Sequence, residues 1–456
     1  METSEPQRPG EGPGPRTARL AFAPMRMKPV MMLPMIGNVL LAVVVPLGQP
    51  SAQGDAARSS SIVRYRAVLE SPGGELPFFL EIQGLRDKPK AWIINGQERV
   101  EVPMTHWDGD NLVLDITHYD STVRATPVRK VGAVSDDVAE LRGRWRKRRS
   151  KDRWSQLDFS ASSAGQRRFS RLAAPEGASA KYPLIGGRWR VAFTGDEDRA
   201  IGVFEQAADG IVSGTFLTPT GDFRYLAGSY EYGRLRLSCF DGAHAFLFDA
   251  RLQPDGTLAG DFWSGDAWHD TWTAERDDRA ALADGFAMTH WQGKAPLDTL
   301  RFPDLLGTPK SLDDPAFRGK ALVIEVFGSW CPNCHDGAAY LVELDKRYRR
   351  RGLSIVGLAF EATGDFERDA RQVRKFARRH GIEYPLLVAG ISDKNSVPKS
   401  LPFLDRLRAF PTTIFLHRDG RIRAIHTGFS GPATGDAYDR LQDEFESIIE
   451  ELLEEK

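Results

Sequence analysis

The chain has 456 residues, which is more than one ordinary hydrophobic core accommodates, so two or three domains are expected. Hydrophobic residues make up 41% of the chain and charged residues 27%, an ordinary composition for a globular protein. The formal net charge of -1 gives no reason to expect a nucleic-acid partner, and we predict none. With only three cysteines, Cys239, Cys331 and Cys334, a disulfide scaffold is excluded.

Residues 1–54 are predicted to be a targeting segment preceded by a disordered leader. Polar residues rich in Pro and Gly come first, and Arg26 and Lys28 then precede an apolar run over residues 30–47. A positive flank, an apolar segment and an exit of small residues describe a signal peptide, which implies a location in the periplasm or cell envelope. A retained membrane anchor is the alternative, since the run approaches the length that spans a bilayer. Prolines within the run favour cleavage.

Residues 60–182 have the pattern of a β-rich region. Short runs of β-branched and aromatic residues recur there, and Asn95-Gly96 between two such runs is a strong hairpin signal. We expect strands over residues 62–68, 77–82 and 91–94.

Residues 183–275 are predicted to form a second domain, an antiparallel meander that is either a barrel or a sandwich. Short strands recur at regular intervals and are separated by turn residues such as Asp241-Gly242. Cys239 alternates in line with Leu235 and Leu237, which predicts a buried, inert thiol. The expected strands cover residues 211–217, 223–229, 234–240, 244–251, 258–263 and 268–274.

After residue 275 the pattern changes. Residues 276–295 are charged, then rich in Gly and Ala, with no clear period, and are predicted to be a linker. From residue 296 to 456, strands alternate with helices, which predicts an α/β domain. The expected strands cover residues 321–328, 353–360, 412–416 and 422–427, and the expected helices cover residues 333–350, 365–380 and about 436 onward.

Two of the cysteines lie in the sequence Trp330-Cys331-Pro332-Asn333-Cys334, between a buried strand and a helix. Cys331 directly precedes the helix, where backbone N–H groups and the helix dipole stabilise a thiolate that can attack disulfides. Cys334 lies one turn inside the helix, close enough to close a disulfide with Cys331. The pattern therefore predicts a redox-active pair.

Four features together resemble the TlpA/ResA-like branch of the thioredoxin superfamily, over about residues 296–456. They are the Cys331–Cys334 motif with its Trp330, the acidic Glu325 six residues earlier, the strand that begins with Phe410-Pro411, and the hairpin after it. The resemblance implies a thioredoxin fold and an extracytoplasmic thiol-disulfide oxidoreductase that acts as a reductase, with no cofactor and no metal ion. It also implies protein thiol or disulfide substrates and an upstream membrane electron donor.

The resemblance also assigns roles to residues. Cys331 and Cys334 would form the redox disulfide, with Cys331 attacking and Cys334 resolving the mixed disulfide. Pro411 would be cis and face the Cys331 sulfur, and the Phe410 backbone, with Trp330 and Pro332, would contact the substrate. Glu325 would be a buried acid with a raised pKa that exchanges a proton with Cys334. An ion pair of Glu325 with a nearby Lys or Arg is the alternative.

The chain departs from the family pattern in two places. Asn333 stands where many members have proline, and the stretch between Cys331 and Pro411 is long. It contains a loop over residues 361–364 and an extra segment over residues 392–408. These differences leave the redox potential and the choice of partner open.

Three other functions compete with this interpretation. Cys331-Pro332-Asn333-Cys334-His335 also matches the haem-attachment pattern, with His335 as iron ligand, although we predict instead that His335 faces solvent and tunes the thiol pair. A two-cysteine metal-binding envelope protein is the second alternative. The third is a binding protein whose β region is the working part, with an accessory thioredoxin module.

Overall fold

A computed structural model describes residues 62–455 apart from residue 86 and residues 129–137, 164–166, 177–181, 292–296 and 394–396. All described residues belong to one compact unit, Ala52–Lys456. The predicted signal peptide or anchor lies almost wholly outside that unit and entirely outside the described residues. Among the described residues, every helix is too short or too polar to span a bilayer.

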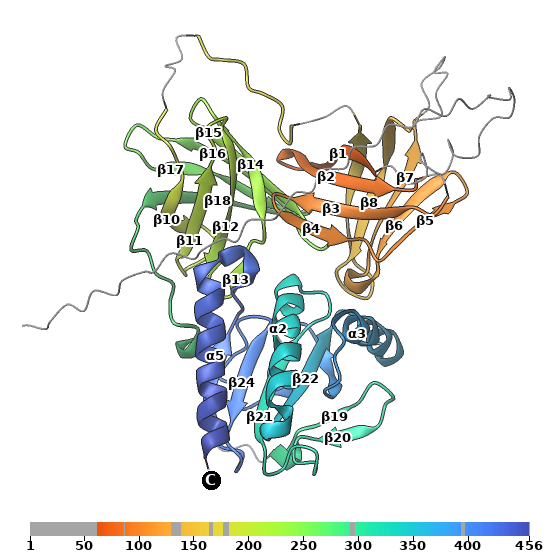
Figure 1. Cartoon of the computed structure of the whole chain (residues 1–456), viewed down its shortest axis with the longest axis vertical. Helices are drawn as coiled ribbons and strands as arrows, with labels where there is room; N and C mark the ends of the chain where they lie inside the picture. Colours follow the sequence, from red (N-terminus) through yellow and green to blue (C-terminus); the bar gives the residue numbers. More distant parts are fainter. Residues whose placement is uncertain are drawn as a thin grey trace, which may run out of the picture. The chain divides into compact units, whose positions relative to one another are not determined.

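The first β region is an open antiparallel sheet (Figure 1). Within the described residues its nine strands follow the order β4-β3-β2-β1-β9-β8-β7-β6-β5, so the first and last strands pair in the middle. The predicted hairpin at Asn95-Gly96 is confirmed, since it joins β3 to β4. The elements are β1 (Ile62–Ser71), β2 (Gly74–Gln83), β3 (Lys90–Asn95), β4 (Glu98–Glu101), β5 (Met104–Asp108), β6 (Asn111–Ile116), η1 (Thr117–Tyr119), β7 (Ser121–Pro127), β8 (Glu140–Arg148) and β9 (Trp154–Ser162).

The second sheet closes on itself, because β11 pairs with both β10 and β12. The barrel, rather than the sandwich, is therefore the observed form. Its interior is aromatic, with the Phe216 and Phe248 rings stacked at 4.6 Å and Trp272 packed against Phe216 at 5.2 Å. The strands are β10 (Gly187–Phe193), β11 (Ala200–Gln206), β12 (Ile211–Thr218), β13 (Gly221–Asp222), β14 (Leu226–Glu231), β15 (Arg234–Phe240), β16 (Ala245–Leu252), β17 (Leu258–Ser264) and β18 (Trp268–Arg276).

Two details of this sheet bear on the predictions. Cys239 is fully buried in the closed core, as the alternation along β15 predicts. The strand predicted over residues 223–229 is interrupted, because β13 ends at Asp222 and β14 starts at Leu226. Arg224, between them, has φ of 60° in the left-handed region. Its side chain therefore leaves the ladder and reaches outside the sheet.

The segment predicted as a linker is partly buried. Met288 and Thr289 are buried, and the Thr289 hydroxyl lies 2.7 Å from the Thr427 hydroxyl in a strand of the C-terminal domain. The short helical turn η2 (Gly285–Ala287) packs against the same strand. Independent folding on either side of this segment stays a prediction.

The C-terminal domain is the predicted α/β fold. Within its described residues, five strands follow the order β23-β22-β21-β24-β25, with β21 to β23 parallel and β24 and β25 antiparallel (Figure 1). The strands are β19 (Arg301–Pro303), β20 (Pro309–Ser311), β21 (Ala321–Phe327), β22 (Leu353–Glu361), β23 (Leu386–Ile391), β24 (Thr412–Leu416) and β25 (Ile422–Thr427). The helices and turns are η3 (Leu297–Thr299), α2 (Pro332–Tyr348), η4 (Arg349–Arg351), α3 (Phe366–His380), α4 (Val397–Ser400), η5 (Pro432–Thr434) and α5 (Asp436–Glu454).

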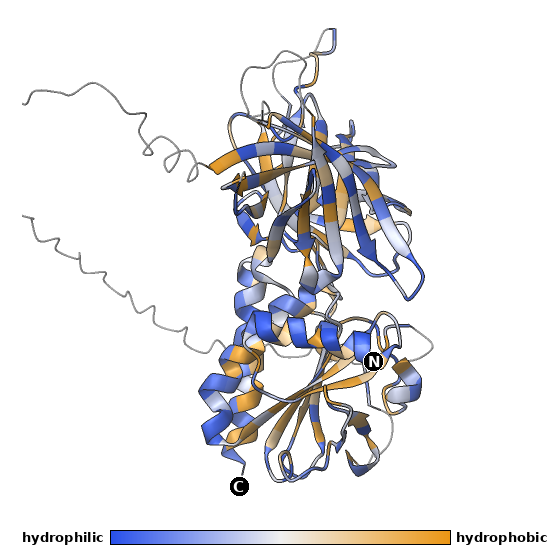
Figure 2. Cartoon of the chain, turned by 90° about the vertical axis from the view of Figure 1, so that its right-hand side faces the viewer, coloured by the Kyte–Doolittle hydropathy of each residue, from blue (hydrophilic) through white to orange (hydrophobic). Residues whose placement is uncertain are grey.

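Alternation along β21 decides what each face of this sheet contacts. Val323 and Phe327 share a core with α2, α3 and α5, whereas Leu322 and Ile324 share a core with the segments before β21 and before β24. Figure 2 shows these strands in the hydrophobic colours and the helices with hydrophilic outer sides. Glu325 has the same parity as Val323 and Phe327, so its carboxyl points toward the helices.

Local signals explain where the helices begin. Asp365 caps α3 by accepting a hydrogen bond from the Arg368 N–H, and Gly381 ends it with φ of 64°.

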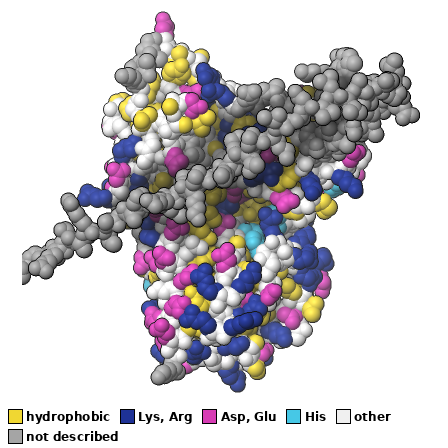
Figure 3. Space-filling view, in the orientation of Figure 1, with side chains coloured by type: hydrophobic (Ala, Val, Ile, Leu, Met, Phe, Trp, Pro, Cys, Tyr) yellow, Lys and Arg dark blue, Asp and Glu magenta, His cyan; other side chains and the backbone are white. Residues whose placement is uncertain are grey.

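On the visible surface, acidic and basic side chains are interspersed (Figure 3), which is consistent with the small net charge of the chain.

Candidate active site

Cys331 lies where β21 gives way to α2. It caps the helix, since its Sγ accepts a hydrogen bond from the Cys334 backbone N–H at 3.3 Å. Pro332 follows at the first helical turn, where a backbone N–H would have no partner within the helix. Both cysteines are free thiols in the structure, and Cys331 is 7% exposed. The sulfur that the motif predicts to attack disulfides therefore lies at the N-terminus of α2.

Cys334 and Glu325 form the buried floor of the site. Burial, with a contribution from Cys331, raises the pKa of the Cys334 thiol well above its ordinary value. Burial, with a smaller contribution from Cys331, raises the pKa of Glu325 to about 8. Glu325 Oε1 has no hydrogen-bond partner among the described residues. A Cβ on Gly337 would lie 3.0 Å from that oxygen, so glycine at this place in α2 leaves room for the carboxyl.

Phe410, Pro411 and Trp330 border the sulfur of Cys331 on another side. The Phe410–Pro411 peptide bond is cis, and Cys331 Sγ lies 3.4 Å from the Phe410 carbonyl oxygen. The Trp330 ring packs edge-on against Phe410 with centroids 5.5 Å apart, and its Nε1 donates to the Phe360 carbonyl at 2.9 Å. Trp330 and Phe410 are both half-buried. The fold therefore gathers the predicted site residues from two segments about 80 residues apart in the chain.

Comparisons with known proteins agree with this geometry. A family model described as Redoxin matches residues 292–441. The chain is 28% identical over 124 residues to the thioredoxin-like protein YneN of Bacillus subtilis (strain 168). It is 27% identical over 125 residues to the thiol-disulfide oxidoreductase ResA of Geobacillus kaustophilus (strain HTA426). Over these residues the C-terminal domain is similar to thiol-disulfide oxidoreductases of the TlpA/ResA-like branch of the thioredoxin superfamily.

These matches concern part of each protein. Each covers 27% of this chain, and they cover 65% of YneN and 63% of ResA. The chain thus spans just under two thirds of the length of these curated relatives. A solved thiol:disulfide interchange protein of the thioredoxin family from Chlorobium tepidum TLS is 20% identical, with a TM-score of 0.26, over 34% of this chain and 92% of its own.

The TlpA/ResA-like domain holds a second buried acid that the sequence predictions missed. Glu361, assigned to a loop, is the last residue of β22 and is 1% exposed. Its carboxyl accepts hydrogen bonds from the Ser329 N–H and hydroxyl, both at 2.8 Å. Burial raises the pKa of Glu361 to about 7. It therefore anchors the turn that leads into Trp330 and Cys331. The sequence signal that could have identified Glu361 is a carboxylate at the end of an apolar strand.

The prediction that His335 faces solvent is wrong. His335 is 5% exposed, and its ring nitrogens lie 2.7 Å from His380 Nε2 and 2.9 Å from the Ser329 carbonyl. Burial lowers the pKa of His335 well below its ordinary value, so the ring is neutral. The physical reason is that Phe376 of α3 packs against the His335 ring, with ring centroids 4.6 Å apart, and shields it from solvent. Helical periodicity alone does not show which neighbouring element covers a polar face of a helix.

The same contacts bear on the haem and metal alternatives. Both ring nitrogens of His335 are engaged in hydrogen bonds, so neither points toward an open ligand position. Among the described residues, no group of three or more His, Cys, Asp or Glu side chains is placed to hold a metal ion.

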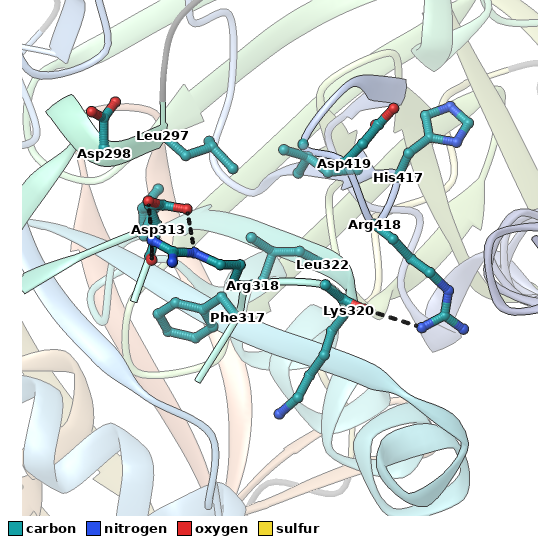
Figure 4. A pocket seen from close by; sticks show the side chains of 14 residues that line it. Leu297, Asp298, Asp313, Phe317, Arg318, Lys320, Leu322, His417, Arg418 and Asp419 are labelled. Atoms are coloured by element: carbon teal, nitrogen blue, oxygen red, sulfur yellow. Dashed lines mark hydrogen bonds and ion pairs between the residues drawn. The ribbon is translucent and has the colours of Figure 1, made fainter. Parts of the chain in front are cut away.

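A pocket of about 480 Å³ lies away from the cysteines (Figure 4). It opens near Leu322, at the start of β21, whereas Cys331 follows the other end of that strand. Two of its charged groups have partners within the wall, since Arg318 pairs with Asp313 at 2.6 Å and Arg418 donates to the Gly319 carbonyl at 3.3 Å. The pocket is therefore separate from the redox site.

Proposed function

We propose that this protein is an extracytoplasmic thiol-disulfide oxidoreductase that reduces protein disulfides through Cys331 and Cys334. The observation that carries the proposal is the arrangement around the sulfur atoms. Cys331 caps a helix, the Phe410 carbonyl lies beside it, and Glu325, whose Oε1 has no hydrogen-bond partner among the described residues, lies in the buried floor. An attacking thiolate, a substrate-facing backbone and a proton-exchanging acid are the parts that disulfide reduction needs.

In the first step, the Cys331 thiolate attacks one sulfur of the substrate disulfide. A bond forms between Cys331 Sγ and that sulfur, the substrate S–S bond breaks, and the leaving thiolate takes a proton from solvent. The Cys334 N–H, which donates to Cys331 Sγ, holds the sulfur at the helix N-terminus for this attack.

In the second step, Cys334 resolves the mixed disulfide. Its thiol must first lose a proton, which the high pKa of this buried group opposes. Glu325, whose pKa of about 8 lies near working pH, can accept that proton in its ionised form. The Cys334 thiolate then attacks Cys331 Sγ, which releases the second substrate thiol. The substrate has gained two electrons, and Cys331 and Cys334 are joined in a disulfide.

The remaining roles follow from the same site. The Phe410 backbone beside cis-Pro411 is suited to pair with an extended substrate segment, and Trp330 and Pro332 border that path. A thiol donor must reduce the enzyme's disulfide after each cycle, and we assign this to an upstream membrane protein. The apolar run over residues 30–47 supports export, with or without a retained anchor.

Trapping the mixed disulfide tests the proposal. In Cys334→Ser the attack should occur without resolution, so a covalent adduct of enzyme and disulfide peptide should accumulate, linked at Cys331. Mass spectrometry of the adduct identifies the sulfur, and Cys331→Ser should form none. An adduct on Cys334 in the Cys331→Ser protein, formed as fast as the adduct in Cys334→Ser, would contradict the assigned roles.

A further inference from the structure

One side of the redox site is covered by the turn between β12 and β14, which we call the hairpin wall (Thr218–Asp222). Asp222 Oδ2 accepts a hydrogen bond from the Gly431 N–H at 2.7 Å, in the loop after β25. A Cβ added to Gly221 would lie 1.8 Å from Asn333 Nδ2, so this backbone presses on the residue between the two cysteines. The wall thus contacts both the cysteine motif and a loop beside it.

A second close approach extends the contact. A Cβ on Gly428 would lie 2.8 Å from the Pro219 carbonyl oxygen and 2.7 Å from the Thr220 carbonyl carbon, with φ of 82° at Gly428. Glycine at this position is what permits the hairpin wall to lie against the end of β25. The Gly428 N–H in turn donates to the carbonyl of the cis-proline, Pro411, at 2.9 Å. The wall therefore contacts a residue that is hydrogen-bonded to Pro411.

A buried ion pair holds the hairpin wall in place. Arg224, just beyond the wall, pairs with Asp336 of α2 and with Glu98 of the first sheet, the latter at 2.7 Å. Its own backbone N–H donates to Asp222 Oδ1 at 2.7 Å, which links the ion pair to the wall. Charged groups buried in this way are costly to separate because each would be left unpaired.

The first sheet supplies a neighbouring wall. The rings of His118 and Tyr119 lie 5.2 and 4.7 Å from the His335 ring, which follows Cys334 in α2. Gln372 of α3 donates to the carbonyls of Thr117 and His118, both at 2.8 Å. Both β sheets therefore pack against the helices that carry and flank the cysteines.

The half-buried rings of Trp330 and Phe410 mark the remaining side of Cys331. A stable contact between folded proteins covers roughly 800 Å² on each partner, whereas an extended segment needs only one backbone edge and a few side chains. We propose that the hairpin wall determines substrate class: it admits disulfides carried by extended peptide segments and excludes disulfides on the surfaces of folded proteins. This inference rests on the proposed function, since it takes Cys331 as the attacking thiol.

The experiment compares two probes that carry the same reacting bond. One is a linear peptide with a glutathione mixed disulfide on its central cysteine, and the other is a folded protein with that modification on one exposed cysteine. Rate constants for reduction by the full chain are measured with Asp222→Ala and with Asp336→Asn. Asp222→Ala removes the hydrogen bonds that Asp222 accepts from Gly431 and Arg224, and Asp336→Asn removes the charge that pairs with Arg224. Each variant should favour opening of the wall, speed reduction of the folded probe by about tenfold and leave reduction of the peptide unchanged.

Asp270→Ala is the matched control, because Asp270 also accepts a hydrogen bond from a glycine N–H, that of Gly195 at 3.0 Å, elsewhere in the closed sheet. It should leave both rates unchanged. A parent protein that reduces both probes equally would overturn the inference. So would folded variants, verified by circular dichroism, that keep the parent's preference. A parent no more active than Cys331→Ser on either probe would instead overturn the proposed function.

Discussion

Cys239 in the closed sheet and Cys334 in the TlpA/ResA-like domain are both fully buried, and burial raises the pKa of both thiols. Their surroundings differ. Cys239 lies near the end of β15, opposite Phe246 in an aromatic core. Cys334 lies in the first turn of α2, with a second sulfur beside it and the Glu325 carboxyl near it. Burial makes a thiol inert unless a second sulfur with which it can react and a proton acceptor lie beside it.

The largest expected effect tests the two cysteine environments directly. Cys331→Ser should lower disulfide reduction by at least about 1,000-fold, because a serine hydroxyl remains protonated and forms no disulfide. Cys239→Ala should leave the rate within about twofold, since it only shortens a side chain in the closed core. Reduction of a disulfide peptide measures both. A comparable loss in Cys239→Ala would show that the two regions share the redox chemistry.

A core truncation tests whether the regions also differ in folding. Phe248→Ala should cost about 3–5 kcal/mol of unfolding free energy in the closed sheet, because Phe248 stacks on Phe216 and Phe262. Alkylation of Cys331 by iodoacetamide should change by less than about twofold if that sheet folds as a separate module. Urea unfolding gives the change in unfolding free energy, and the rate of alkylation gives the change at Cys331. A matched Phe415→Ala, in the core beneath the cysteines, should alter both measurements, and identical behaviour of the two variants would argue against separate modules.

The Glu325 carboxyl is the chemical feature by which the surroundings of Cys334 differ from those of Cys239. Glu325→Gln keeps the shape and removes the titrating proton, so attack by Cys331 should persist while resolution of the mixed disulfide slows by about 10- to 1,000-fold. The measurement is the lifetime of the trapped mixed disulfide between about pH 6 and 9, a range that spans the expected thiol pKa values. Glu361→Gln is the control, because Glu361 is equally buried but hydrogen-bonded to Ser329. Equal lifetimes in parent and Glu325→Gln would make Glu325 a structural residue.

The last expected effect is on how stability depends on pH. The pKa of Glu325 is raised from 4.5 to about 8, so between these values the folded state holds a proton that the unfolded state releases. Stability from this group is full below pH 4.5 and is lost as the pH rises through 8, by at most about 1.4 kcal/mol per pH unit. Urea midpoints for Glu325→Gln should therefore fall less steeply with pH than those of the parent. Parallel curves would show that the carboxyl is solvated.

Much of the C-terminal domain could be predicted from local patterns. The apolar run of β21, the helical spacing of α3 and α5 and the hairpin before β25 all depend on residues close together in the chain, and the structure has each of them. The turns and alternation of the second sheet were equally readable. Whether that sheet closed was not, because closure depends on the pairing of β11 with β12, which alternation does not specify.

The sequence by itself determined the cysteine pair, the acid on β21 and the proline beside the sulfur, since each is marked by its neighbours in the chain. Only the tertiary structure decided that His335 is buried, that Glu361 holds Ser329, that Asp222 reaches the loop after β25, and that Arg224 reaches the cysteine helix. Periodicity assigns a side chain to a face, but the segment that covers that face can lie more than 100 residues away. Contacts of that kind depend on how the sheets pack together, which no local pattern encodes.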